Sequence, residues 1–136
     1  MAAMACGAPV ARGPSGKPVF DRSAVRHPRN QPFFCFKAVD SKGDTDDVCE
    51  SVKESCAQAV GAVKAEGGSV VSGCVEVDAV SCFVMYVGGI GSQRQAYCRA
   101  TPDQCSAQRA YFAKANGTDD SLSACERLDR TFEPEH

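Results

Sequence analysis

The sequence has no tryptophan, only two histidines and no long apolar run, and these shortages exclude several classes of protein. No stretch approaches the roughly 20 apolar residues that a membrane-spanning helix needs. With 15 Lys and Arg against 17 Asp and Glu, the chain also lacks the basic excess of a general nucleic-acid binder. We therefore expect no transmembrane segment and no nucleic-acid partner. At 136 residues the chain has room for one domain, or two very small ones.

Motifs for catalysis and for cofactors are missing as well. Nucleophilic catalysis needs a base near Ser, Cys or Thr, and the two histidines, His27 and His136, lie in the N-terminal segment and at the last residue. The glycines of residues 88–91 are not followed by the Gly-Lys-Ser/Thr of a phosphate-binding loop, so we interpret them as a hairpin turn. We expect no catalytic residue, no cofactor and no enzymatic activity.

Cysteine, in contrast, is abundant, with nine in the chain. Eight of them fall into two sets with similar spacing, since separations of 14, 7 and 18 residues recur as 16, 7 and 20. Fixed spacing of this kind indicates an internal repeat. We expect two tandem modules of about 45–50 residues each, covering residues 33–78 and 79–136, on the cysteines Cys35, Cys49, Cys56 and Cys74, and Cys82, Cys98, Cys105 and Cys125.

Each module reads as a ββα unit followed by a return segment. Aromatic and β-branched residues over 33–39 and 80–87 predict strands, each followed by turn residues and a second strand. Helices should follow from Ser51 and Thr101, where Ser-x-x-Glu and Thr-x-x-Gln fit the capping box, and should end at Gly67 and Gly117. The predicted fold class is therefore α+β, disulfide-rich.

Hairpin geometry predicts how the cysteines pair. Folding each hairpin about its centre places Cys35 opposite Cys49 and Cys82 opposite Cys98, and the return segments are long enough to reach the helical cysteines. We expect these two bridges together with Cys56–Cys74 and Cys105–Cys125. The alternative pairs Cys49 with Cys56 and Cys35 with Cys74, and repeats that pattern in the second module. Loops of about 15 residues stabilise by roughly 3 kcal/mol each, which matters in units this small.

Metal binding is the competing interpretation of the cysteines. An intracellular metal-thiolate protein would hold one ion on each four-cysteine set, but structural zinc sites use cysteines two to four residues apart, and this sequence has none. The acidic residues Asp40, Asp44, Asp46 and Asp47 lack the glycine and glutamate of a calcium loop, so we interpret them as a solvated turn. We expect no metal site.

Residues 1–32 have a different composition, with five of the seven prolines and a net charge of about +4. We expect them to form a disordered basic tether that adds nothing to the core. Disulfides rarely persist in a reducing cytosol, so we expect a secreted or cell-envelope protein whose export signal is absent from this sequence. Cys6, in Ala-Cys-Gly, is either a bacterial lipid-attachment residue, which would associate the protein with a membrane, or a free thiol.

The sequence favours the role of a non-catalytic binding or structural module that contacts an unidentified protein or envelope component. Tyrosine and arginine are enriched at interfaces, and here they concentrate in the second module. We therefore expect a binding surface there, formed by Tyr86, Arg94, Tyr97, Arg99, Arg109 and Tyr111. The alternative from another class is a small secreted enzyme or enzyme inhibitor.

Overall fold

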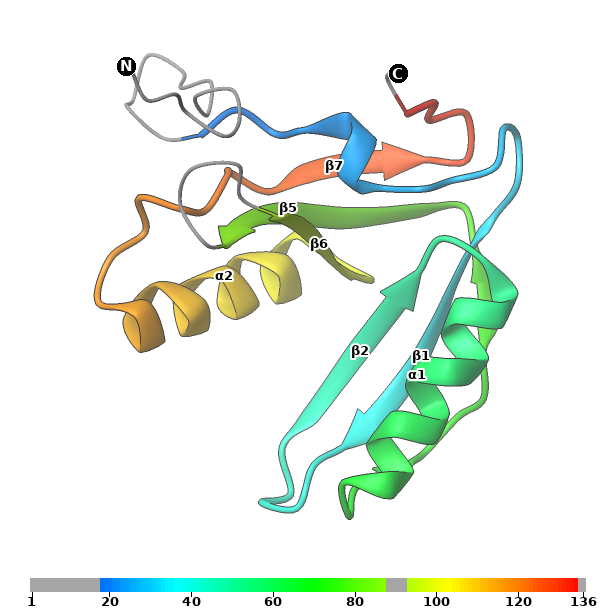
Figure 1. The fold of residues 1–136 in the computed structure, drawn as a ribbon. Helices are drawn as coiled ribbons and strands as arrows, with labels where there is room; N and C mark the ends of the chain where they lie inside the picture. The colour runs from blue at the N-terminus through cyan, green and yellow to red at the C-terminus, as the bar shows by residue number, and fades with distance from the viewer. Residues whose placement is uncertain (1–17, 88–92, 135–136) are drawn as a thin grey trace.

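The structure is a computed structural model that describes residues 18–87 and 93–134. This part of the chain is α+β, with a sheet of antiparallel strands, two helices and four disulfides (Figure 1). Its elements are a short 3-10 turn η1 (Arg22–Ala24), the strands β1 (Phe33–Val39), β2 (Thr45–Glu50), β3 (Ser69–Val70), β4 (Val75–Val77), β5 (Ala79–Val87), β6 (Gln93–Arg99) and β7 (Glu126–Asp129), and the helices α1 (Lys53–Ala65) and α2 (Pro102–Asn116).

Two antiparallel hairpins form the centre of the sheet. The strand order is β3-β1-β2-β6-β5-β7, and β4 pairs with β1 beside β3. The hairpins β1–β2 and β5–β6 meet through β2 and β6, which share only two residue pairs, Val48–Arg99 and Cys49–Cys98. Beyond these two pairs β2 and β6 diverge, as Figure 1 shows. The turn at residues 88–92, expected to join β5 to β6, lies outside the described residues.

The cysteines divide the sheet into two chemically different faces. Cys35, Cys49, Cys98 and Cys82 are successive partners across four adjacent strands, so their side chains lie on one face. Their neighbours in sequence face the other way. There Phe36 packs with Cys56 of α1, and Phe83 packs with Cys105 of α2. Both helices therefore cover the same face of the sheet.

The helix ends follow the predicted signals at three of four positions. Thr101 Oγ1 accepts a hydrogen bond from Gln104 N (3.2 Å), and Gly67 and Gly117 adopt φ of 89° and 78°. The reciprocal half of this capping box does not form, because Gln104 Nε2 donates to Asp47 and Gln104 Oε1 has no partner within the described residues. The capping box expected at Ser51 is wrong, because α1 begins one residue later with Val52 as an N-cap that makes no side-chain bond. Ser51 Oγ instead donates to the Arg26 carbonyl (2.6 Å). The seven-residue separation of Cys49 and Cys56 matches that of Cys98 and Cys105, and it aligns Val52 with Thr101.

The N-terminal segment covers the cysteine face behind the second hairpin. Phe20 and Val25 are 7% and 3% exposed and pack in the same cluster as Cys82, Cys98 and Phe132. In Figure 1 this segment, in blue, lies on the side of β5 away from α2. The expected tether of residues 1–32 is therefore wrong for residues 18–32. Proline excluded regular pairing, but it did not prevent an extended chain from packing through a few apolar side chains. Residues 1–17 lie outside the described residues.

His27, placed in the tail by sequence, fastens this segment to the C-terminal end of the described chain. It is 4% exposed and stacks on Phe33 at a centroid distance of 4.1 Å. Its Nδ1 lies 3.1 Å from the Phe132 carbonyl oxygen, and its Nε2 lies 2.7 Å from that of Gln31. The segment is thus held by polar contacts as well as by apolar packing.

Phe20→Ala tests this packing. Because Phe20 is buried in the main cluster, we expect the substitution to lower the free energy of unfolding by about 3 kcal/mol, measured by urea denaturation of the oxidised protein. Val19→Ala is the control, since Val19 is 47% exposed and its contact with Tyr86 uses only the backbone carbonyl. If both variants lose an equal and small amount of unfolding free energy, residues 18–32 are a loose tether and do not stabilise the fold.

Candidate functional site

The four disulfides connect the elements that surround the candidate site. Cys35–Cys49 and Cys82–Cys98 cross the two hairpins with Cα separations of 4.0 and 4.1 Å. Cys56–Cys74 and Cys105–Cys125 tie each helix to the segment that follows it, with Cα separations of 6.2 and 6.3 Å. These pairs coincide with those expected from hairpin geometry, and the alternative pairing is wrong. Because the eight sulfurs are bonded in pairs, the four-cysteine metal sites of the competing interpretation do not form. Cys6 lies outside the described residues.

The six residues expected to form a binding surface do not lie together. Tyr86 and Arg94 hold the N-terminal segment, since Tyr86 Oη donates to the Val19 carbonyl (2.9 Å) and Arg94 Nη1 forms an ion pair with Asp21. Partial burial raises the pKa of Tyr86, the Asp21 charge adds to that rise, and the Arg94 charge opposes it. These two side chains are occupied by the protein's own chain.

Tyr97 and Arg109 support α2 from inside. The Tyr97 ring lies 5.4 Å from that of Phe83 and 4.8 Å from that of Phe112, and its burial raises its pKa against the opposing charge of Arg99. Arg109 donates to the carbonyls of Ser123 (2.6 Å) and Leu122 (3.1 Å). Of the six residues, Tyr111 is the most exposed, at 66%, and the Arg94 side chain stays half exposed beside Asp21. The six side chains therefore do not form one patch, because residue type does not separate structural tyrosines and arginines from exposed ones.

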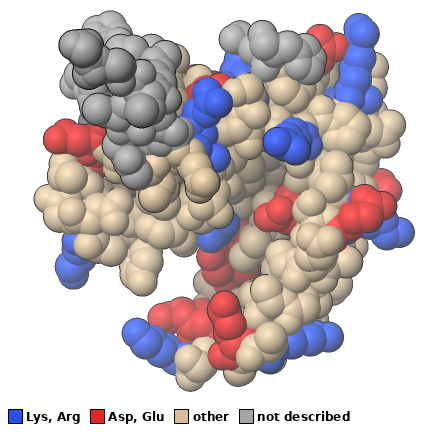
Figure 2. Space-filling model, in the orientation of Figure 1, with Lys and Arg blue, Asp and Glu red and all other residues tan. Residues whose placement is uncertain are grey.

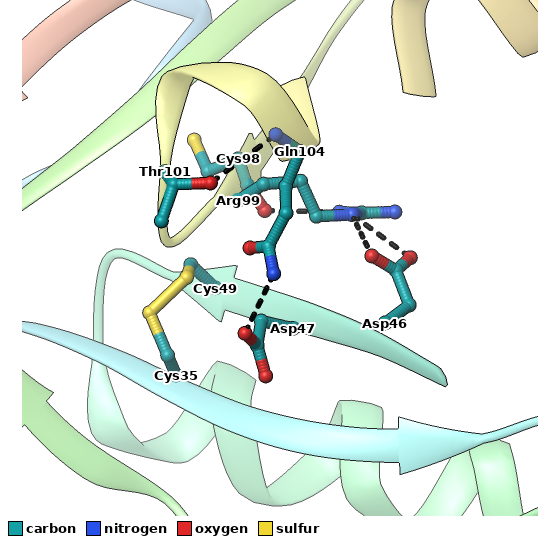
Figure 3. Close-up of polar contacts among 8 residues, drawn as sticks. All are labelled: Cys35, Asp46, Asp47, Cys49, Cys98, Arg99, Thr101 and Gln104. Atoms are coloured by element: carbon teal, nitrogen blue, oxygen red, sulfur yellow. Dashed lines mark hydrogen bonds and ion pairs between the residues drawn. A yellow bond between two sulfur atoms is a disulfide. The ribbon is translucent and has the colours of Figure 1, made fainter. Parts of the chain in front are cut away.

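Arg99 lies at the junction of the two hairpins, beside the acidic turn (Figure 3). Its side chain is 9% exposed, and Nε donates to both carboxylate oxygens of Asp46, at 3.0 and 2.9 Å. Nη1 donates to the Cys98 carbonyl (2.9 Å). Because Asp46 is on β2 and Arg99 is on β6, this ion pair adds a side-chain connection where the backbone pairing is short.

A second connection joins β2 to the first turn of α2. Gln104 Nε2 donates to Asp47 Oδ2 (2.8 Å), and Lys37 Nζ lies 3.7 Å from Asp47 Oδ1 (Figure 3 draws the first contact). The other amide atom, Gln104 Oε1, is buried and has no hydrogen-bond donor within the described ranges. Two of the four carboxylates in the expected acidic turn are therefore bound to the second hairpin and its helix.

The remaining acids shape the turn between β1 and β2. Asp40 Oδ1 accepts hydrogen bonds from the backbone N–H groups of Lys42 and Asp44, both at 2.9 Å. Gly43 adopts φ of 89°, which a glycine tolerates without strain. Across residues 18–87 and 93–134, no group of three or more His, Cys, Asp or Glu side chains is placed to hold a metal ion.

A cleft of about 610 Å³ opens between this turn and α2. One wall is the β1–β2 turn with the C-terminal end of α1, and the other is the face of α2 that carries Gln104, Gln108 and Tyr111. Figure 2 shows the hollow between the α2 side and the tip of the hairpin, where acidic side chains gather. Its volume is in the range of pockets that bind small molecules or short peptide segments. This cleft is the candidate functional site.

Sequence reasoning missed most of the cleft. It singled out Tyr111 and the acidic turn, but it did not bring them together, and it gave no role to Gln108 or Glu66. No local pattern marks these residues, because the cleft exists only where two hairpins diverge. Spacing identifies contacts within a hairpin, whereas this site depends on how one hairpin is set against the next.

Comparison with known proteins adds no assignment. No protein-family model, no curated protein and no solved structure matches the chain. Among the helices of the described residues, none has the length and apolar content to cross a membrane.

Asp46→Ala tests whether the ion pair at the junction stabilises the fold. The substitution leaves the nearly buried Arg99 without its carboxylate, so we expect the free energy of unfolding to fall by about 2 kcal/mol. Asp44→Ala is the matched control, because Asp44 is an exposed acid in the same hairpin, and we expect a change within about 0.5 kcal/mol. Urea denaturation of both variants measures the difference. If Asp46→Ala costs no more than Asp44→Ala, the pair does not stabilise the junction.

The environment of the Glu50 carboxyl group should make the stability of the protein depend on pH. Burial raises its pKa, and the nearby Arg99 charge opposes that rise. The folded protein then holds the proton more tightly than the unfolded chain, so stability falls as the pH rises through the folded-state pKa. We expect Glu50→Gln to be more stable than the parent at neutral pH, by less than about 1 kcal/mol.

At strongly acidic pH the two proteins should be equally stable, because Glu50 is then protonated in both states. Urea denaturation at the two pH values measures the change, with the exposed Glu76→Gln as the control. A gain that persisted at strongly acidic pH would show that the substitution acts through packing and not through the carboxyl charge.

Proposed function

We propose that this protein is an exported, non-catalytic binding module of the cell envelope or secreted fraction. The observation that carries the proposal is the set of four disulfides, which is typical of extracellular proteins and rare in a reducing cytosol. Disulfides of this number stabilise small domains whose core is too small to do so alone. In this proposal the protein's role is to present a surface and not to perform a reaction.

The proposal includes the hypothesis that the fold consists of two tandem copies of one module. Each hairpin carries a cross-strand disulfide, each is followed by a helix with a buried cysteine, and each helix is bridged to the segment after it. The two hairpin bridges have nearly equal Cα separations, and so do the two helix bridges. These similarities support two tandem ββα modules, with the boundary after residue 78, on a sheet that continues across it.

The cleft supports binding as the function. It is lined by side chains from the first hairpin, from the end of α1 and from α2, and it carries the exposed ring of Tyr111. Large exposed aromatic side chains beside a hollow are common at sites of protein contact. In the proposal the N-terminal residues, with their basic charge or with a lipid on Cys6, tether this module to an envelope.

Counting thiols in cells that make the protein tests export. Cells are treated with a maleimide polymer that blocks thiols during lysis, and the denatured, unreduced protein is then examined for the resulting shift in mobility. We expect one modified cysteine at most, since eight are bonded to one another. Reduction before alkylation is the control and should expose all nine cysteines of the sequence. Eight or nine reactive thiols without reduction, together with recovery in the cytosolic fraction, would refute the proposal.

A further inference from the structure

The walls of the cleft differ in chemistry. The side formed by the β1–β2 turn and the end of α1 carries four carboxylates and one lysine, from Asp40, Asp44, Asp46, Glu66 and Lys42. The opposite side, on α2, contributes amide and aromatic groups from Gln104, Gln108 and Tyr111. An occupant of this cleft therefore meets a negative wall and a neutral wall that can form hydrogen bonds.

The negative wall is only partly neutralised by the protein itself. Asp46 is bound to Arg99, which lies at the junction and not among the residues lining the cleft. Asp44 and Glu66 are exposed, and within the described residues no ion pair to either side chain is formed. Lys42 is the one basic side chain in the lining, so the wall keeps a negative balance that favours a cationic occupant.

Tyr111 adds a second, independent preference for positive charge. Tyr111 is 66% exposed, and its ring packs edge-on against that of Phe112 with the centroids 5.7 Å apart. A lysine or arginine over the face of such a ring is attracted by its quadrupole. Val48, Val63 and Ala107 also line the cleft, and they supply apolar surface for the methylene groups of a long basic side chain.

We infer that the cleft binds a basic, extended segment of a partner protein. Lysine or arginine side chains of the segment lie against Asp44 and Glu66 and over Tyr111. Gln108, which lines the cleft beside Tyr111, supplies a side-chain amide that both donates and accepts as a peptide group does, and it would hydrogen-bond the backbone of the segment. Gln104 holds the wall in place, since its Nε2 donates to Asp47 and its Oε1 is buried. The volume of about 610 Å³ accommodates several residues rather than a single ammonium group. This inference rests on the proposed binding function and specifies its partner.

A peptide-binding assay with the oxidised, full-length protein tests the inference. The probe is a fluorescein-labelled peptide of about eight residues that alternates glycine and lysine, followed by fluorescence anisotropy at about 0.15 M salt, where long-range attraction is screened. Matched peptides with glutamate or serine in place of lysine are the comparison. We expect the lysine peptide to bind and the other two to show no measurable binding.

Variants locate the binding on the protein. We expect Asp44→Asn/Glu66→Gln to weaken binding about tenfold, and Tyr111→Ala to weaken it about threefold. The control, Glu76→Gln/Glu126→Gln, removes two exposed carboxylates outside the cleft and gives the same net charge, so we expect a change of less than about twofold. All substituted side chains are exposed, and circular dichroism spectra will verify that each variant folds.

Three results would overturn the inference. The first is that the control variant weakens binding of the lysine peptide as much as Asp44→Asn/Glu66→Gln does, which would show that only the net charge of the protein matters. The second is equal binding of the glutamate or serine peptide, and the third is no binding of the lysine peptide to the parent protein. The thiol count and the cell fraction decide the export proposal separately, so a failure here leaves that proposal standing.

Discussion

The short pairing between β2 and β6 is the constraint on which the rest of the structure depends. Only Val48–Arg99 and Cys49–Cys98 join the two hairpins in register, and the strands diverge beyond them. That divergence opens the cleft between the first hairpin and α2. The contacts of Arg99 with Asp46 and of Gln104 with Asp47 cross the same junction, so they hold the position of one cleft wall relative to the other.

The disulfides explain how the fold can be stable with only two residue pairs between β2 and β6. Each hairpin is closed by its own bridge, and each helix is bonded to the segment that returns to the sheet, so neither half relies on the junction for its internal order. In a chain with three separate apolar clusters, covalent closure reduces the entropy of the unfolded state where burial alone is limited. The acidic side chains can then remain at the cleft, because stability does not require apolar residues there.

Sequence was sufficient for features that are local or covalent, and insufficient for features that depend on the arrangement of the hairpins. Aromatic and β-branched content predicted β1 and β5, glycine predicted the C-terminal ends of the helices, and spacing predicted the cysteine partners across each hairpin. It failed for Phe20 and Val25, because two apolar residues among prolines carry no period. It also failed for Arg99 and Tyr97, whose exposure is set by strands and helices distant in sequence.

The N-terminal segment makes two similar halves unequal. It packs on the cysteine face of the sheet, where Tyr86 and Arg94 of the second hairpin hold it and His27 stacks on Phe33 at the start of β1, while Lys37 further along β1 is exposed. Tyr86 and Arg94 are partly used in this contact, and the opposite side of the sheet bears the two helices. The cleft at α2 is on that side. In the binding mode that we propose, the packed segment leaves the cleft as the surface for a partner, because Asp44, Glu66 and Tyr111 line it and are exposed.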